Sequence, residues 1–229
     1  MDPDIASVAA LIGHSARANI LLALMGGVAL PAGELANAAN VTPQTASSHL
    51  SKLLAARLLE LEVEGRRRFY RLRGPEVAAL IESLGSLARP YSFPASHGSD
   101  RSNALQFART CYNHLAGTIA VDIAEALQAR GYLTAEPNRQ YHITDTGRAW
   151  FRNLQINFSD LKFRSSGIAI QCLDWTERRP HLAGPVGVMF LGRLFDLKWL
   201  ARGERPRAVR ITSTGREKLR EILGIKIVR

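Results

Sequence analysis

The chain has 229 residues and a formal net charge of +10, with 30 Lys and Arg against 20 Asp and Glu. That length accommodates two domains with separate cores, and the basic excess favours a nucleic acid as partner. No apolar run approaches the ~20 residues that cross a membrane, and the acidic start MDPDIASVAALIG lacks the cationic segment of a secretory signal, so we expect a cytoplasmic protein with no membrane partner.

Two helices are predicted at the start of the chain. In residues 2–12, Ile5, Val8 and Leu11 recur at steps of three, which places them on one helical face. Ser15 can cap a second helix that runs to about residue 25. Both helices would bury one apolar face.

Residues 30–73 predict two short helices, a tight turn and a basic hairpin. Thr42 can cap the second of these helices, and Pro43 fits its first position. One face of this helix is apolar, with Ala46, Leu50, Leu53, Leu54 and Leu58 at steps of three and four. The opposite face carries polar groups able to read base edges, namely Gln44, Thr45, Ser47, Ser48, His49 and Lys52. The pattern indicates a helix-turn-helix with a recognition helix; the alternative is a packing motif in an unrelated helical domain.

A hairpin is predicted directly after the recognition helix. Leucine and valine alternate with glutamate in 59–64, the period of a half-buried strand, and Gly65 supplies the turn. The return strand RRRFYRLR holds five arginines, and its glutamate partners can face them across the hairpin. We expect Arg66, Arg67 and Arg68 to neutralise DNA phosphates.

The segments HSARANILLAL, GELANAANVTPQTASSHLSKLLAARLLE and EGRRRFYRL resemble, in order and spacing, the ArsR-type winged helix-turn-helix transcriptional regulators of bacteria. The resemblance covers about the first ninety residues. It implies a homodimer whose recognition helices enter successive major grooves of an inverted repeat in double-stranded DNA, and usually repression relieved by a ligand. It also implies that Arg17 can meet a phosphate; the alternative is a plain surface arginine.

A helix is predicted over 75–87, and the resembled family uses the corresponding helix for dimerisation. Its apolar stripe consists of Val77, Leu80, Ile81, Leu84 and Leu87. Residues 89–101, with two prolines and several Ser and Gly, read as a linker. The expected organisation is therefore a DNA-binding and dimerisation domain over 1–88 and a second domain over 102–229, and all of the excess positive charge lies in residues 89–229. The arginines of that second domain are either a solvated face or additional DNA contacts.

The second domain contains an internal repeat. The tetrapeptide HLAG at 114–117 recurs at 181–184, and ITDTGR at 143–148 recurs as ITSTGR at 211–216. Between these anchors each copy predicts a helix (118–130 and 185–197), a short strand (131–133 and 198–200), a turn, a second strand and a helix capped by threonine. The predicted fold class is α+β, mostly α with small hairpins: a winged helix-turn-helix followed by two winged-helix-like repeats.

Two cysteines and two histidines stand at the heads of these repeats. Cys111 and His114 are three apart, which would put them on one helical face, and Cys172 precedes His181. If the repeats bring their heads together, the four side chains suit zinc, copper(I) or a thiophilic metalloid. The alternatives are buried structural side chains or a small organic effector in a pocket walled by aromatic residues. The pocket walls would be Tyr112, Trp175 and Trp199.

The familiar metal sites of the resembled family are not matched here. The segment PAGELANAAN lacks the cysteine pair that some members carry, and PEVAALIESLGSL lacks the Asp and His set of others. Any sensing is therefore expected in the second half. The cofactor stays open between a soft or borderline metal ion and an organic effector.

The sequence predicts a homodimeric, sequence-specific transcriptional regulator, a repressor rather than an enzyme. No phosphate-binding glycine loop, H-E-x-x-H or G-x-S-x-G motif occurs, and a Cys111–His114 nucleophile pair would lack an orienting partner and an anion hole. Two alternatives are a basic protein that coats DNA without sequence preference and a protein-interaction module.

Overall fold

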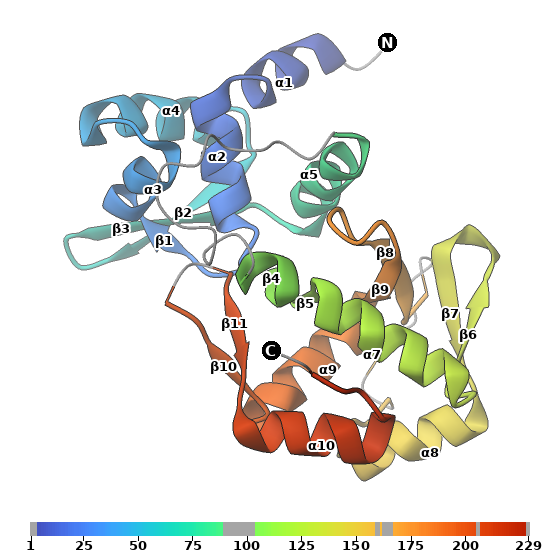
Figure 1. Ribbon diagram of the computed structural model, residues 1–229. Coiled ribbons are helices and arrows are strands. Elements are labelled where there is room, and N and C mark those ends of the chain that lie inside the picture. Colours follow the sequence, from blue (N-terminus) through green and yellow to red (C-terminus); the bar gives the residue numbers. More distant parts are fainter. Residues whose placement is uncertain (1–3, 89–103, 159–160, 162–166, 205–206, 228–229) are drawn as a thin grey trace. The chain divides into compact units, whose positions relative to one another are not determined.

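The computed structural model describes residues 4–88, 104–158, 161, 167–204 and 207–227 (Figure 1). The chain divides into two compact units, Met1–Gly85 and Ser86–Arg229. The expected linker, 89–101, lies outside the described residues.

Unit 1 is a small helical bundle edged by an antiparallel sheet in the order β1-β3-β2. The sequence predicted the five helices and the hairpin, but not the short third strand β1. The helices are α1 (Ile5–Ile12), α2 (Ser15–Leu24), α3 (Ala32–Ala39), α4 (Pro43–Ala55) and α5 (Pro75–Leu87). The strands are β1 (Leu30–Pro31), β2 (Leu59–Glu64) and β3 (Arg67–Leu72).

The predicted start of α4 is confirmed. The Thr42 side chain accepts a hydrogen bond of 3.2 Å from the Thr45 N–H, and Pro43 occupies the first turn. Leu50 and Leu53 are almost wholly buried in the core of unit 1. The cap and the apolar stripe together fix which face of α4 is left for solvent.

The first two helices differ from the prediction in their caps. α1 begins at Ile5 and is capped by Asp4, whose side chain accepts a hydrogen bond from the Ser7 N–H. None of the residues of α1 is buried. His14, rather than Ser15, caps α2: its Nδ1 accepts from the Ala16 N–H at 3.3 Å. An imidazole nitrogen can accept this bond as a hydroxyl does.

Among the described residues no single helix is long and apolar enough to span a membrane. The pair α1 and α2, bent by 86° at their junction, has the length and composition of a span only when both helices are taken together. Ile20, Leu21 and Leu24 of α2 are buried in the core of unit 1.

Unit 2 confirms the predicted repeat and adds a hairpin at the head of each copy, so that each copy reads hairpin, helix, hairpin, helix. The first consists of β4 (Arg109–Cys111), β5 (His114–Ala116), α7 (Thr118–Ala129), β6 (Leu133–Glu136), β7 (Gln140–Ile143) and α8 (Asp145–Asn153). The second consists of β8 (Ile170–Leu173), β9 (Pro180–Ala183), α9 (Gly184–Asp196), β10 (Leu200–Arg202), β11 (Val209–Ile211) and α10 (Ser213–Leu223).

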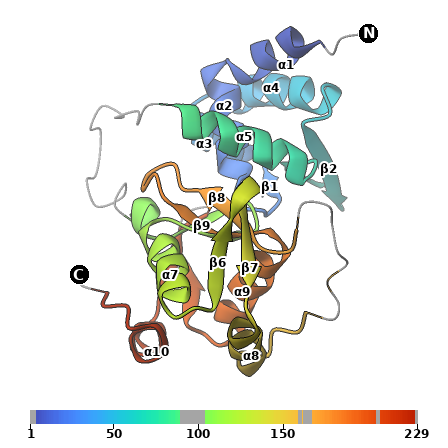
Figure 2. The ribbon, with the colours of Figure 1, turned by 90° about the vertical axis from the view of Figure 1, so that its right-hand side faces the viewer.

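The two copies are interleaved rather than stacked end to end. β6, β7, β8 and β9 form one antiparallel sheet, so the second hairpin of the first copy joins the first hairpin of the second (Figure 2). α7 packs against β9, and α9 packs against β5. Each copy thus buries the apolar face of its first helix partly on the other copy, which forms one shared core.

The repeated ITxTGR segment makes the same turn twice. Thr144 and Thr212 cap α8 and α10 by accepting from the N–H groups of Gly147 and Gly215, at 3.0 and 2.9 Å. A side chain on either glycine would collide with the backbone carbonyl of Tyr132 or Trp199, because an added Cβ would lie 2.0 or 2.1 Å from its oxygen. The repeat therefore preserves a close helix–strand contact that only glycine allows.

Candidate nucleic-acid interface and thiol–imidazole cluster

The polar face of α4 is exposed at most of its predicted positions. We call this surface the recognition face; its exposed side chains are Gln44, Thr45, Ser47, Ser48, Ser51 and Lys52. Ser51 was missed in the sequence, although it lies one helical turn beyond Ser47 and Ser48. The recognition face presents hydroxyl, amide and ammonium groups, the chemistry that reads base edges and phosphates.

The structure buries two of the predicted contact residues, Arg17 and His49, which leaves little of either side chain for DNA. Arg17 is 8% exposed, and its guanidinium donates to the carbonyl oxygens of Ala10 and Leu11. It therefore satisfies the C-terminal carbonyls of α1 instead of reaching a phosphate.

His49 lies on the inner side of α4, 8% exposed, with its ring 4.6 Å from that of His14. Burial lowers the pKa of His49, and the neighbouring charges of His14, Arg17 and Lys52 lower it further. The imidazole thus belongs to the packing between α2 and α4, since a helix of 3.6 residues per turn carries position 49 to the face of Ala46 and Leu53.

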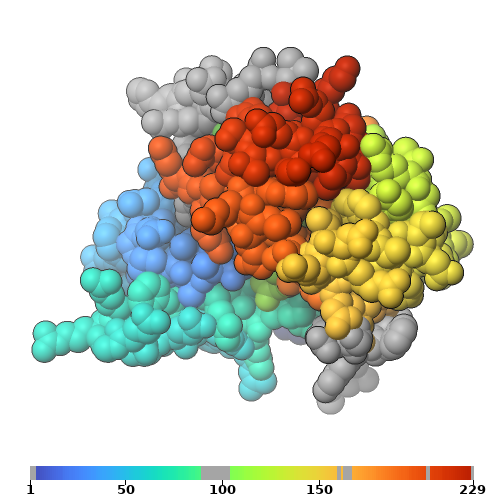
Figure 3. Space-filling view, turned by 90° about the horizontal axis from the view of Figure 1, so that it is seen from below, coloured from blue at the N-terminus to red at the C-terminus, as the bar shows by residue number. Residues whose placement is uncertain are grey.

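The predicted basic hairpin, β2–β3, is hereafter the wing. It pairs in register from Leu59 opposite Leu72 to Glu64 opposite Arg67, and Figure 3 shows it (teal) as a narrow projection. Arg66, Arg67 and Arg68 at its tip are all exposed. A hairpin with three guanidinium groups at its end is equipped to grip a phosphate backbone.

The base of the wing is neutralised internally, as predicted. Arg71 forms ion pairs of 2.9 Å with both Glu60 and Glu62. Of the apolar residues of β2, Leu59 is buried but Leu61 and Val63 are 39% and 62% exposed. The half-buried face expected from the alternation therefore holds only at the inner end of the strand.

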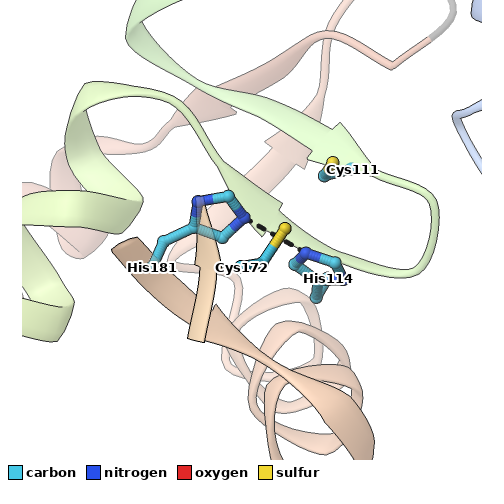
Figure 4. Close-up of side chains that lie close together, drawn as sticks. All are labelled: Cys111, His114, Cys172 and His181. Atoms are coloured by element: carbon cyan, nitrogen blue, oxygen red, sulfur yellow. Dashed lines mark hydrogen bonds between the residues drawn. The ribbon is translucent and has the colours of Figure 1, made fainter. Parts of the chain in front are cut away.

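The four cysteine and histidine side chains at the heads of the repeats come together in unit 2. We call Cys111, His114, Cys172 and His181 the thiol–imidazole cluster. The spacing of Cys111 and His114 predicted a shared helical face, and this was wrong. The two are opposite residues of the hairpin β4–β5. Cys172 and His181 are opposite residues of β8–β9. Each repeat supplies one cross-strand Cys–His pair, and Figure 4 shows the two pairs converging.

The cluster is compact and buried. One potential ligand atom from each residue lies within 4.8 Å of all the others, and the Nε2 atoms of His114 and His181 are 3.1 Å apart. The exposed fractions run from 0% for His181 to 7% for Cys111. Neither cysteine forms a disulfide. Two thiols and two imidazoles thus share one dry site contributed equally by both repeats.

A buried ion pair that the sequence analysis missed stands beside the cluster. The guanidinium of Arg109 donates to both oxygens of Asp174 at 2.9 Å, and Asp174 also accepts from the Gly117 N–H at 2.8 Å. The hydroxyl and backbone N–H of Thr176 donate to the same carboxylate. Asp174 Oδ2 is 3.5 Å from His181 Nδ1, on the side of the ring away from His114. Arg109 and Asp174 are 2% and 1% exposed. Each lies near the end of a short strand, where the sequence has no period that would indicate a buried charge.

Protonation in this region follows from burial and the ion pair. Burial raises the pKa of Asp174, but the Arg109 guanidinium and the hydrogen bonds from Thr176 and Gly117 outweigh it and hold that pKa well below its usual range. Burial lowers the pKa of His181 to about 4, against the opposing effect of Asp174. At neutral pH the carboxylate is charged and the imidazole is neutral.

The repeated HLAG segment explains how both histidines reach the cluster. Gly117 and Gly184 have φ of +91° and +75° at the point where a strand turns into a helix. An added Cβ at Gly117 would lie 2.5 Å from the Gln106 carbonyl oxygen. Only glycine fits this turn without strain, so the tetrapeptide places a histidine three residues before each of these glycines.

Two of the three aromatic residues expected as pocket walls, Trp175 and Trp199, have other contacts. Trp175 lies between the guanidinium groups of Arg109 and Arg207, each 5.2 Å from its ring. Trp199 belongs to the core of unit 2, and Tyr112 stands in the β4–β5 turn with a φ of +56°. The pocket for an organic effector therefore loses Trp199 as a wall.

Known proteins resemble this chain. A family model described as a helix-turn-helix domain matches residues 12–62. The HTH-type transcriptional regulator YdfF of Bacillus subtilis, described as uncharacterized, is 40% identical over 227 residues, which cover 99% of this chain and 100% of YdfF.

Two solved structures show partial likeness. The homodimeric winged helix-turn-helix DNA-binding domain Mb0332 of Mycobacterium bovis, a possible ArsR-family regulator, is 28% identical over 41% of this chain and 86% of its own, with a TM-score of 0.35. Reduced HlyU of Vibrio cholerae is 29% identical over 36% of this chain and 85% of its own, with a TM-score of 0.33. With a relative 40% identical over its whole length and a helix-turn-helix match over residues 12–62, the chain belongs to the DNA-binding transcriptional regulators of the helix-turn-helix type.

Proposed function

We propose that the protein is a cytoplasmic, homodimeric, sequence-specific repressor that binds an inverted-repeat operator and is controlled by an effector in unit 2. The observation that carries the proposal is the combination, within one unit, of an exposed polar recognition face on α4 and three exposed arginines at the tip of the wing. Neither surface is consumed by packing in the described part of unit 1.

The recognition face and the wing divide the work of binding. Short hydroxyl and amide groups such as Gln44 and Ser48 discriminate base edges in the major groove. Lys52 and the wing arginines contact phosphates, which gives affinity without sequence preference. Specificity should therefore depend on α4 and the salt dependence on the wing.

A second copy of the chain is the proposed partner of the apolar residues left exposed on α1 and α5. Ile5 and Leu87 are 71% and 83% exposed, and Leu80 and Leu84 are 37% and 42% exposed on the same helix as Leu87. Apolar stripes of this kind are costly in water and are typical of interfaces. An isologous dimer would present two recognition helices related by two-fold symmetry, which matches an inverted repeat.

Sequence preference is tested on the recognition face. After selection of the preferred operator from a random DNA library, we expect binding to exceed that of bulk DNA by ~10³ or more at fixed salt. Replacing Ser47→Ala and Ser48→Ala together should reduce this ratio by about tenfold or more, because base-edge hydrogen bonds are lost. Binding to bulk DNA should stay within about twofold.

The control for this test is Ser83→Ala, an exposed serine of α5. A ratio near one for the unmodified protein would contradict the proposal and favour a protein that coats DNA without preference. Increased expression of a reporter when the protein binds its operator would contradict repression but leave specific binding intact.

The dimer is tested on α5. The change Leu80→Lys with Leu84→Lys should convert a dimer into a monomer in sedimentation equilibrium, because two charges would be buried in the interface. The matched control, Ala79→Lys with Ser83→Lys, adds the same charge to exposed positions of the same helix. A wild-type monomer at concentrations where it binds the full operator would contradict this part of the proposal.

A further inference from the structure

We infer that the thiol–imidazole cluster is a tetrahedral binding site for one divalent ion of borderline-to-thiophilic character, zinc(II) above all. The four side chains come from two cross-strand pairs, Cys111 with His114 and Cys172 with His181, and their ligand atoms lie within 4.8 Å of one another. Two thiolates and two imidazoles are one of the standard ligand sets of structural zinc.

The distances in the cluster are close to those of a coordination sphere. A tetrahedral centre with metal–nitrogen bonds of about 2.0–2.1 Å holds its two nitrogens about 3.3 Å apart, and metal–sulfur bonds of about 2.3 Å hold two sulfurs about 3.8 Å apart. The imidazole nitrogens are already 3.1 Å apart, and no pair of ligand atoms exceeds 4.8 Å. Small side-chain rotations on a fixed backbone are enough to close the sphere.

Charge balance selects a divalent ion. Two thiolates cancel the charge of one divalent cation, and the adjacent Arg109–Asp174 pair is neutral by itself. A monovalent ion such as copper(I) would leave a net negative charge in a site where every ligand residue is at most 7% exposed. Uncompensated charge is expensive at such a depth. Magnesium and calcium are excluded by the ligand set, because they prefer oxygen.

The Asp174 carboxylate lies next to His181 and would orient this ligand without binding the ion itself. Asp174 Oδ2 is 3.5 Å from His181 Nδ1, while Nε2 of the same ring faces the cluster. A carboxylate near one ring nitrogen favours the proton on that nitrogen and directs the lone pair of the other toward a metal. Arg109, Gly117 and Thr176 fix the carboxylate in place.

The site is closed and joins the two repeats. All four positions of a tetrahedral ion are supplied by the protein, so none is open to a substrate. One pair of ligands stands on β4–β5 and the other on β8–β9, so the ion would add a bond between two hairpins that packing and the Arg109–Asp174 ion pair already hold together. When the ion binds, each thiol forms a metal–sulfur bond and releases one proton, two in all.

The ion is also the effector that unit 2 requires, and this second part rests on the proposed function. An ion that tightens the contact between the repeats shifts unit 2 toward the conformations that bind the ion. Metal binding is regulatory only if the metal-bound and metal-free forms differ in their affinity for DNA. Metal binding itself is independent of what unit 1 does.

The ligand set is tested on the full chain, prepared metal-free with a chelator in reducing buffer. Addition of cobalt(II) should give one equivalent bound per chain, with the visible bands of a tetrahedral ion and a thiolate charge-transfer band, and zinc(II) should displace it. X-ray absorption of the zinc form should show two sulfur and two nitrogen neighbours. Two thiols should lose their reactivity toward a thiol reagent when zinc is added. These readouts need no variant.

Single replacements then assign the ligands. Cys111→Ser, His114→Gln, Cys172→Ser and His181→Gln should each lower zinc affinity at least a hundredfold, whereas His142→Gln, which alters an exposed histidine of β7, should leave it unchanged. The site is overturned if the wild-type chain binds less than one equivalent with micromolar affinity. It is equally overturned by a sulfur-free coordination shell, or if a disulfide forms between the cysteines in reducing buffer.

The effector role has its own measurement. Operator affinity of the zinc-loaded and metal-free chains should differ by at least about fivefold, and Cys172→Ser should abolish the difference. Equal affinities with zinc bound would overturn the effector role and leave the site intact. Absence of specific DNA binding in both forms would instead overturn the proposed function.

Discussion

Replacement of Arg66, Arg67 and Arg68 together by alanine is expected to lower the affinity for DNA of any sequence by about a hundredfold or more at moderate salt. These three residues are exposed at the tip of the wing and are where unit 1 concentrates positive charge. In the proposed dimer they supply up to six phosphate contacts. Each such contact contributes about 0.9 to the slope of log affinity against log salt, so this slope should become shallower by up to about 5.

Filter binding or fluorescence anisotropy across a salt series measures this change. The matched control replaces three exposed arginines of unit 2, Arg152, Arg210 and Arg220, by alanine and removes the same charge. If these arginines form a solvated face, the control should keep the wild-type slope. If it behaves like the wing variant, the arginines of unit 2 bind DNA as well, and the special role of the wing is refuted.

Replacement of Asp174 by alanine is expected to lower the free energy of unfolding of unit 2 by about 3–5 kcal/mol, because it leaves a buried guanidinium without its partner. Arg109 and Asp174 have side chains only 3% and 0% exposed. The change also removes the acceptor for the N–H groups of Gly117 and Thr176.

Urea denaturation followed by tryptophan fluorescence is the suitable measurement, since Trp150, Trp175 and Trp199 all lie in unit 2. A chelator should be present, so that any bound ion does not contribute. Glu125→Ala breaks an exposed ion pair with Arg179 of 2.7 Å and should cost less than about 1 kcal/mol. In a double-mutant cycle, Arg109→Met with Asp174→Ala should be less destabilising than the sum of the two single changes. Equal costs for Asp174→Ala and Glu125→Ala would contradict the expectation.

The sequence by itself determined what depends on short-range patterns. The cap at Thr42, the apolar stripe of α4 and the Glu–Arg pairing of the wing follow from residues within a few positions of one another, and all three were confirmed. The repeat in unit 2 was also visible, because HLAG and ITxTGR each need a glycine where a strand meets a helix.

Only the tertiary structure decided which side chains are buried and which meet across the chain. The polar side chains of Arg17 and His49 were predicted to be exposed on their helices. The packing of α2 against α1 and α4 buries both. The hairpin register pairs Cys111 with His114 and Cys172 with His181, and the interleaving of the repeats then joins the pairs. Burial, register and the meeting of the two pairs depend on contacts between separate elements, and such contacts leave no period in a single sequence.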